Sequence, residues 1–509
     1  MKKAFLLVFA LMIMCSISFA QIKSAQTGNW NDPATWTGGK IPTATDDVSV
    51  EAGITVTVDV NNAACKNLSI DGTLTFPDVD ARQITINGNV TVNATGKFNT
   101  YASGSTTAIR SQTIVIKGDL KIISGGNFDM RRGSNPNVGV GTVVFDGTTV
   151  SNIYLTQTVY GSSIEEFNSV TINKTGTGKV VLKTGNLYMS NNSSTAPTIL
   201  TLTSGIVETE GTSIWGYLAT SATNLIGGSK TAYFKGALGR GISNSSSAKR
   251  DYPVGDAQGY RPLTLKSTTG TATGHLVVVQ CVSGNANSGS STFAGGIDKV
   301  SGVRYYKVSY TKSGAATAAS SVNIDTLGLA YASGDGVAAN NSNLRVAYSS
   351  NERALWTGAP QTTAHITTLT DPPTMIVANQ LATPITVNAD AASIYVALAR
   401  MSGTSENSLT GSTDVEKLDG IPTSFQLSQN YPNPFNPETS ISFSIPNSSL
   451  VSIKVYDVTG KEVAALLNEY RNAGNYKLNF NASKLASGVY IYKLDAGNFS
   501  ASKKMILMK

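Results

Sequence analysis

"ITINGNVTVNATGKFNTY", residues 84–101, and "IVIKGDLKIISGGNFDMR", residues 114–131, decide the fold of this chain because they are two copies of one pattern. Their apolar residues, their glycines and one phenylalanine coincide at an offset of about thirty residues. The chain therefore contains an internal repeat. Looser copies of the pattern lie at residues 68–76, 170–175, 180–189 and 199–209.

Each copy alternates between apolar and polar residues, as in Ile84-Thr85-Ile86, so one face of each short strand is buried and the other is wet. A unit of two such strands cannot bury its apolar face alone, but copies stacked along an axis bury it together. The pattern predicts a right-handed parallel β-helix with glycines such as Gly88 and Gly118 at its corners. A β-sandwich of hairpins is the alternative, since "NG", "DG" and "KG" are also hairpin signals.

The whole composition is typical of an all-β protein with more than one folded unit. The 509 residues are 41% hydrophobic and 14% charged and include 48 glycines, and a single core rarely grows beyond about 250 residues. The predicted division is a signal peptide (1–20), a cap with the first strands (21–60), the β-helix (61–247), a β-sandwich (248–401), a flexible linker (402–424) and a C-terminal immunoglobulin-like β-sandwich (425–509).

The N-terminus, "MKKAFLLVFALMIMCSISFAQ", has a basic start, an apolar stretch and a small-x-small cleavage pattern that predicts cleavage before Gln21. Cys15 raises a lipoprotein alternative, although the bulky Met14 before it is wrong for lipid attachment. No later apolar run reaches the roughly 18 residues that a membrane helix needs. Loss of Lys2 and Lys3 lowers the net charge from +7 to +5. Spread over the whole mature chain, this charge is too diffuse to form the basic patch that binds a nucleic acid.

Two tryptophans follow the cleavage site, in "GNWNDPATWTGGKIP" at residues 28–42. This segment resembles the Trp-rich opening module of secreted β-helix surface proteins of Bacteroidetes-type bacteria. We expect Trp30 and Trp36 to plug the first rung, because the open end of a solenoid must be covered. Stacking of a sugar on these rings is the alternative.

Three prolines precede the last alternating segment, in "QNYPNPFNPETSISFSIP" at residues 429–446. Because proline lacks a backbone N–H and forces its predecessor to be extended, this segment cannot belong to a central strand. It can fix the entry to a new domain whose first strand buries Ile441, Phe443 and Ile445. Further predicted strands lie at residues 450–460, 461–467, 475–483, 488–497 and 502–509.

Four motifs of this domain, "NYPNPFNPET", "IKVYDVTGKEV", "LASGVYIYKLDAG" and "SKKMILMK", occur in an order and at a spacing that resemble the type A C-terminal sorting domain of type IX secretion cargo proteins. The resemblance covers residues 425–509. It implies a secreted or surface-attached protein that reaches its place through the periplasm and outer membrane. The signal residues that it implies are Pro432, Pro434, Phe435, Gly460, Gly488, Lys503 and Lys504.

The resemblance also implies partners: the type IX secretion machinery, a sortase-like processing enzyme and surface lipopolysaccharide. For the passenger in front of the signal we expect a structural or adhesive role, with extracellular glycans as candidate ligands. A non-catalytic glycan-binding protein would need exposed aromatic residues, for which Trp215, Tyr217 and Trp356 are the candidates. Cys65 and Cys281 are too few for a disulfide scaffold, and Cys281 shares a strand face with core valines.

Catalysis finds little support in the sequence, and we assign no catalytic residue, metal site or cofactor. The two histidines, His275 and His365, lie in no metal or nucleophile motif. A polysaccharide lyase would have to use Asp119, Asp129, Arg131 and Arg132 on corresponding faces of the repeat. Scattered aspartates that could ligate calcium are Asp46, Asp47 and Asp335.

A glycosidase alternative rests on Glu208 and Glu210 in "VETEG". Their i, i+2 spacing places both carboxylates on one strand face, roughly 6–7 Å apart, which is near the lower limit for an inverting pair. Exposed strands often carry such pairs without any chemistry. The balance is therefore against an enzyme.

Overall fold

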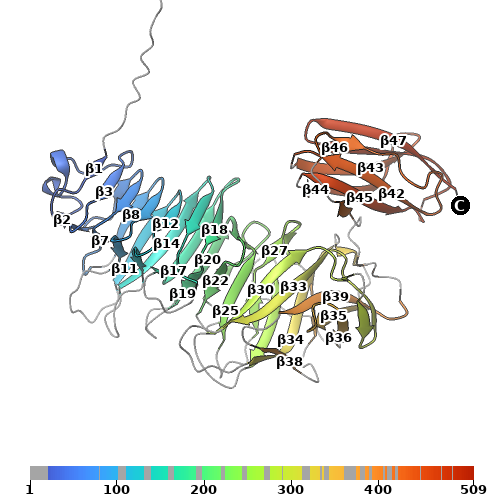
Figure 1. Cartoon of the computed structure of the whole chain (residues 1–509), viewed down its shortest axis with the longest axis horizontal. Helices are drawn as coiled ribbons and strands as arrows, with labels where there is room; N and C mark the ends of the chain where they lie inside the picture. The colour runs from blue at the N-terminus through green and yellow to red at the C-terminus, as the bar shows by residue number, and fades with distance from the viewer. Residues whose placement is uncertain are drawn as a thin grey trace, which may run out of the picture.

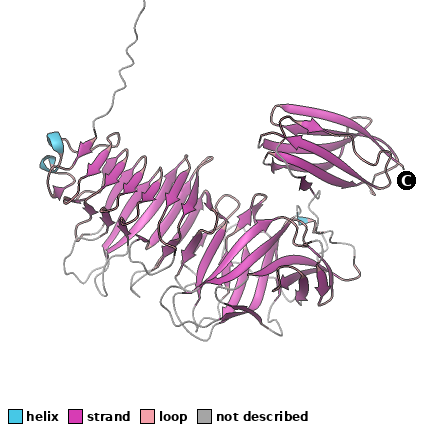
Figure 2. Ribbon diagram, in the orientation of Figure 1, coloured by secondary structure: helices cyan, strands magenta, loops and turns pink. Residues whose placement is uncertain are grey.

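The computed structural model describes residues 21–508, so the predicted signal peptide with Cys15 lies outside the described residues. Among the described residues, no helix has the length and apolarity to cross a membrane. Strands dominate, and short 3₁₀ helices (η1, Pro33–Thr35, and η2, Thr37–Gly39) lie near the N-terminal end (Figure 2). Also outside the description are residues 80, 101–109, 131–138, 159–164, 191–197, 219–223, 243–248, 269–274, 289–290, 312–320, 333–334, 338–342, 360–373, 379–383, 389–392, 405–406, 408, 410–414, 419–421, 448, 472, 484 and 509.

Stacked parallel sheets form the N-terminal part of the chain and confirm the β-helix (Figure 1). The repeat offset is the rung-to-rung register, since Ile84 pairs with Ile114 and Phe98 pairs with Phe128. The first sheet contains β1 (Ile22–Lys23), β3 (Val48–Val50), β6 (Leu68–Ile70), β9 (Val90–Val92), β12 (Leu120–Ile122), β15 (Ser151–Tyr154), β18 (Lys179–Thr184), β21 (Ile206–Thr209) and β24 (Phe234–Lys235).

The two other sheets of the β-helix repeat this arrangement with their own strands. One runs in the order β16 (Glu165–Glu166), β13 (Asn127–Asp129), β10 (Lys97–Asn99), β7 (Thr73–Thr75), β4 (Thr55–Thr57) and β2 (Gly28–Asn29). The other runs in the order β23 (Leu225–Gly227), β20 (Leu200–Ser204), β17 (Ser169–Lys174), β14 (Gly139–Gly147), β11 (Arg110–Ile116), β8 (Arg82–Ile86) and β5 (Ala63–Cys65).

Aromatic rings from successive rungs stack inside the β-helix. The ring centroids of Phe76 and Phe98 lie 6.4 Å apart, those of Phe98 and Phe128 lie 5.5 Å apart, and Phe167 continues the series at 5.1 Å. At the N-terminal end, Trp30 and Trp36 pack edge to face at 5.1 Å, and both are buried in the same core. The indole of Trp36 donates to the carbonyl of Trp30. The tryptophans therefore plug the first rung, as expected, and present no face for sugar stacking.

One corner of the β-helix is held by a ladder of side-chain oxygens that accept backbone N–H groups from the next rung. Asn67 accepts from Asn89, Asn89 accepts from Asp119, and Asp119 accepts from Asn152, with a nitrogen–oxygen distance of 2.8 Å in each case. A Cβ atom at Gly118 would lie 2.4 Å from the Asn89 oxygen. The corner glycine therefore leaves room for the ladder, which is why the repeat carries Gly at this position.

The β-helix continues into the β-sandwich through a shared sheet. In that sheet β25 (Ala237–Ile242) pairs in parallel with β22 (Ile214–Tyr217) and antiparallel with β30 (His275–Ser283), so the predicted boundary at 247/248 follows a strand that belongs to both parts. Their buried residues form one core. The rest of the sheet is β19 (Leu187–Met189), β33 (Arg304–Thr311), β39 (Ile394–Met401), β35 (Leu344–Ser349), β36 (Leu355–Ala359), β31 (Thr292–Ala294) and β32 (Ile297–Val300).

A second antiparallel sheet completes the sandwich, and the short hairpin of β27 (Gly255–Asp256) and β28 (Gly259–Tyr260) lies at the junction with the β-helix. The strands of the second sheet are β26 (Arg250–Tyr252), β29 (Leu263–Thr268), β34 (Ser321–Tyr331), β37 (Thr374–Ala378) and β38 (Ile385–Asn388).

The C-terminal β-sandwich has a hydrophobic core of its own, separate from the core of the passenger. One of its sheets has the order β40 (Val415–Leu418), β45 (Gly474–Asn481), β42 (Glu438–Ile445) and β41 (Gln426–Leu427). The other has the order β44 (Glu462–Arg471), β43 (Ser449–Asp457), β46 (Gly488–Ala496) and β47 (Phe499–Leu507).

The stretch predicted as a linker, residues 402–424, is structured near both ends, which the prediction missed. Leu409 is buried in the passenger core, and its N–H donates to the carbonyl of Gly336. Further on, β40 pairs with β45. Isolated apolar residues in a polar stretch give no period, so the sequence offered no signal for either contact.

Candidate functional site

The aromatic residues proposed for glycan binding are buried, so that interpretation of them is wrong. Trp215, Tyr217 and Trp356 are each 0% exposed. The indole N–H of Trp215 lies 3.3 Å from the sulfur of Met189, and the hydroxyl of Tyr217 donates to the carbonyl of Thr198. Trp215 and Tyr217 occupy the inward positions of β22. These rings therefore serve the core and not a ligand.

Glu208 on β21 and Glu210 directly after it both form ion pairs with lysines of neighbouring rungs. Glu208 binds Lys179 at 2.7 Å and Lys235 at 3.1 Å, and Glu210 binds Lys183 at 2.6 Å. Burial pushes the pKa of Glu208 up, but the two lysines outweigh burial and hold that pKa below its ordinary value. A glycosidase acid needs a raised pKa, so this environment favours an ion-pair ladder over catalysis.

The candidate lyase residues do not form a site among the described residues. Asp119 accepts hydrogen bonds from the backbone N–H and the side-chain amide of Asn152, and so belongs to the corner ladder. Asp129 lies on β13, in a different sheet from β12, which begins directly after Asp119. Arg131, Arg132 and His365 lie outside the described residues, and for His275 only the backbone in β30 is described.

The aspartates considered for calcium each bind protein groups. Asp46 accepts from the ammonium of Lys40 and from Thr43, and Asp47 accepts from the amide of Asn67. Within the described residues, no group of three or more His, Cys, Asp or Glu side chains comes together.

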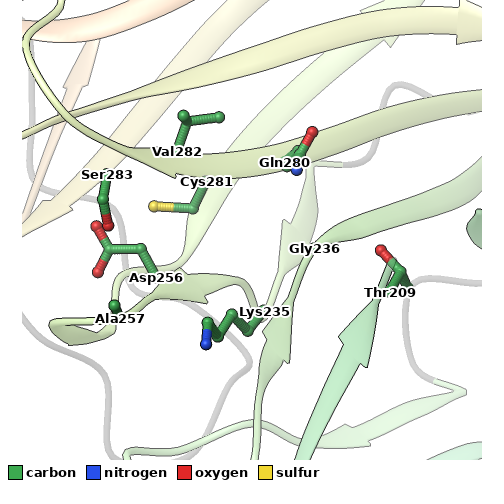
Figure 3. A pocket seen from close by; sticks show the side chains of 9 residues that line it. All are labelled: Thr209, Lys235, Gly236, Asp256, Ala257, Gln280, Cys281, Val282 and Ser283. Atoms are coloured by element: carbon green, nitrogen blue, oxygen red, sulfur yellow. The ribbon is translucent and has the colours of Figure 1, made fainter. Parts of the chain in front are cut away.

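A pocket of about 290 Å³ opens where the β-helix meets the sandwich, between β21, β24, β27 and β30 (Figure 3). Its carboxylate, Asp256, accepts from the backbone of Gln258 and the guanidinium of Arg304. Arg304 also binds Asp335, which in turn accepts from Arg261. The pocket therefore borders a buried, charge-balanced network of two arginines and two aspartates.

The thiol that borders this pocket is not activated. Burial raises the pKa of Cys281 well above its ordinary value, and Cys65 shows the same effect inside the β-helix. Both cysteines are buried and free of any disulfide. A neutral thiol is a poor nucleophile, so the interpretation of Cys281 as a small core residue agrees with its surroundings.

In the C-terminal β-sandwich, residues 429–437 run along the edge strand β47 and form the best-defined surface of the candidate sites. We name these residues the proline segment. Phe435 donates its backbone N–H to the carbonyl of Ile506, and its own carbonyl accepts the N–H of Met508, with a nitrogen–oxygen distance of 2.9 Å in both bonds. The side chain of Asn433 accepts from the N–H of Ile506 at 2.9 Å. Two motifs about seventy residues apart in sequence thus form one continuous edge.

A buried polar network fixes the start of the proline segment. The backbone N–H of Asn430 donates to the hydroxyl of Tyr492, which itself donates to the carbonyl of Ser428 at 2.7 Å. The amide of Asn430 donates to Thr439 and to the carbonyl of Pro432. Burial raises the pKa of Tyr492 to about 12, so its hydroxyl remains a donor at physiological pH.

The predicted signal residues fall into three groups in the structure. Pro432 and Pro434 are exposed and both follow cis peptide bonds, whereas Phe435 is buried and packs on Phe480 with ring centroids 6.3 Å apart. Lys503 and Lys504 are exposed on β47, next to the proline segment. Gly460 has φ +83° in the turn after β43, and Gly488 begins β46 opposite Leu507.

Two family models match the chain. One is described as the secretion system C-terminal sorting domain and covers residues 429–508, from the first residue of the proline segment through β47. The chain therefore carries a C-terminal sorting domain of the kind found on type IX secretion cargo. The other model is described as the G8 domain and covers residues 35–149, from the N-terminal cap into the β-helix. No curated protein and no solved structure matches the chain.

The sorting domain directs this protein to the cell surface or the extracellular space, as predicted, and implies an interaction with the secretion machinery. Sequence reasoning missed Asn430, Asn433 and Tyr492, which hold the proline segment against β46 and β47 within this domain. Asparagines flanking the prolines were a usable signal, because Asn side chains often bond to nearby backbone groups.

Proposed function

We propose that the passenger in front of the sorting domain, residues 21–401, is a structural or adhesive element displayed at the cell surface. The observation that carries this proposal is the single core that runs from the tryptophan plug through the β-helix into the sandwich. A stack of short strands that shares one core and one set of rungs resists bending between its units. Such a body suits the presentation of a long face to a neighbouring surface.

The polar side of the β-helix also supports a structural role. Three lysines of adjacent rungs neutralise Glu208 on β21 and Glu210 directly after it: Lys179, Lys183 and Lys235. Exposed pairs of this kind contribute little individually, about 0–1 kcal/mol, but they keep the outer face charged and wet. We propose extracellular glycans or a neighbouring cell as the partner of that face.

The test compares cells that display the full chain with cells that lack it, in binding to a glycan array and in cell–cell aggregation. Gain of either property with the full chain is the expected result. Turnover on a panel of polysaccharides by the purified passenger would instead identify a carbohydrate-active enzyme and would contradict the proposal. A display control, surface labelling of the exported chain, ensures that a negative result reflects the passenger and not failed export.

We further propose that Pro432, Pro434, Phe435, Gly460, Gly488, Lys503 and Lys504 act as the features of the sorting signal, and that a sortase-like enzyme joins the passenger to surface lipopolysaccharide. Leu409 packs on the passenger and Val415 begins the strand paired with the sorting domain. We place the processing point between these two residues. Mass spectrometry of the surface-released protein tests this placement, and recovery of an intact C-terminus would contradict it.

A further inference from the structure

The outer face of the β44-β43-β46-β47 sheet of the sorting domain carries an apolar patch. Val489 and Ile491 on β46 are 39% and 41% exposed. Val489 pairs with Ile506 on β47, and Ile491 lies between Lys504 on β47 and Tyr456 on β43. Because alternate residues of a strand share a face, these side chains lie on the side opposite the buried Tyr490 and Tyr492.

The lysines on this face differ in their ionic partners. Lys454 binds Glu462 at 2.8 Å, and Lys493 binds Asp495 at 3.0 Å. Lys504 is exposed and has no ion-pair partner among the described residues. Its ammonium group is therefore available to a carboxylate from outside the domain, directly beside the apolar patch.

The patch is continuous with the proline segment. Ile506 and Lys504 contribute side chains to the patch, and the backbone groups of the same two residues bind Asn433, Gln429 and Phe435. The proline segment therefore fixes the edge on which the patch is built. Exposed β-branched residues on a regular sheet near its edge favour unwanted association, so a patch at this position is costly unless a partner covers it.

We propose that this face, formed by Tyr456, Val489, Ile491, Lys504 and Ile506, is the docking surface for a component of the secretion machinery whose own surface is apolar and acidic. The inference rests on the export role of the sorting domain and identifies where and by what chemistry it is recognised. Apolar contacts at the centre supply affinity, and a partner carboxylate on Lys504 sets the register of the complex.

The experiment expresses the full chain in a bacterium with this secretion system and measures the fraction exported relative to the fraction kept in the periplasm. In V489T/I491T, threonine preserves strand propensity and removes apolar surface. We expect the exported fraction to fall on the order of tenfold, the size of a central interface contact. K504E should also reduce export, whereas K504R should not.

The matched control is L450T. Leu450 is 59% exposed and lies on the same outer face, six residues along β43 from Tyr456 and roughly 20 Å away. This variant should be exported normally. The thermal unfolding of each purified full-length variant shows whether the sorting domain is intact, and K504E, a change at an exposed side chain, tests the face without altering the core.

Normal export of both V489T/I491T and K504E would overturn the proposal. If V489T/I491T instead converts a dimer of the full chain into a monomer while export is unchanged, the face belongs to a second copy and the proposal is wrong. A chain that lacks residues 425–509 distinguishes failure of the proposed docking surface from failure of the sorting role of the whole domain. Its retention in the periplasm confirms the sorting role. Surface adhesion of the exported wild type is measured separately and depends neither on this truncated chain nor on the variants of the docking surface.

Discussion

The side-chain oxygen of Asn89 accepts the backbone N–H of Asp119, one rung further along the β-helix, over 2.8 Å. The same geometry recurs from Asn67 to Asn89 and from Asp119 to Asn152. The corner therefore has its backbone donors satisfied by side chains where the chain turns between sheets. A β-helix needs such bonds because its turns lie outside the ladders of the strands.

Replacement of Asn89 by alanine leaves the N–H of Asp119 without its acceptor. We expect N89A to lower the free energy of unfolding by about 0.5–1.5 kcal/mol, the net contribution of one hydrogen bond at a solvent-accessible corner. Urea unfolding of the passenger, followed by circular dichroism, measures the effect. Lys121→Ala, at an exposed residue of β12, is the control and should change stability by less than about 0.5 kcal/mol. Equal stability of both variants would show that the ladder contributes little.

The sequence predicted the β-helix because its repeat is visible as matching residues about thirty positions apart. In the structure, residues at this offset pair with each other on adjacent strands, as Ile84 does with Ile114. It also predicted the five strands from 450 to 509 to within a few residues, since most of them alternate between apolar and polar residues and turn residues separate them. It could not place Trp215, because β22 is covered on both faces and has no polar side to orient it. It could not place Trp356 either, because the exposed residue beside it, Leu355, is apolar and so the strand shows no polar face. Contacts between distant segments, such as Asn433 with Ile506, leave no local pattern.

The ammonium group of Lys174 donates to the carbonyls of Asp146 and Lys117 at 2.6 and 3.1 Å, inside the β-helix. Burial lowers the pKa of Lys174 to about 8, although Asp146 and Asp119 act in the opposite direction. The unfolded chain, with an ordinary lysine pKa near 10.4, holds this proton more tightly between those two values. The contribution of Lys174 to stability therefore increases as the pH rises from about 8 to about 10.

K174M removes this titration. We expect the difference in unfolding free energy between the wild type and K174M to grow in favour of the wild type between pH 7.5 and pH 9.5. Comparison of the two proteins cancels the titration of the other groups that they share. A difference that is constant with pH would contradict the shifted pKa of Lys174.

The buried network at the junction offers a third prediction. Asp335 is 0% exposed, accepts a hydrogen bond from Arg261 and forms an ion pair with Arg304 at 2.8 Å. D335N would leave the buried Arg304 and the partly buried Arg261 with a single carboxylate, Asp256, and removal of one partner from a buried ion pair typically costs about 3–5 kcal/mol. We expect a correspondingly lower unfolding midpoint of the passenger. D298N changes the partly exposed pair with Arg400 and should have a much smaller effect.

The last prediction concerns the edge formed by the proline segment and β47. Asn433 is exposed, yet its side chain binds the backbone of β47 twice, at the N–H of Ile506 and at the carbonyl of Lys504. N433A should weaken this attachment by about 1 kcal/mol while the buried ring of Phe435 keeps the domain folded. If the joined edge is what the secretion machinery recognises, export of N433A falls although the passenger unfolds as in the wild type. N436A changes an exposed asparagine of the same segment and should be exported normally, so equal export of the two variants would show that the attachment serves stability alone.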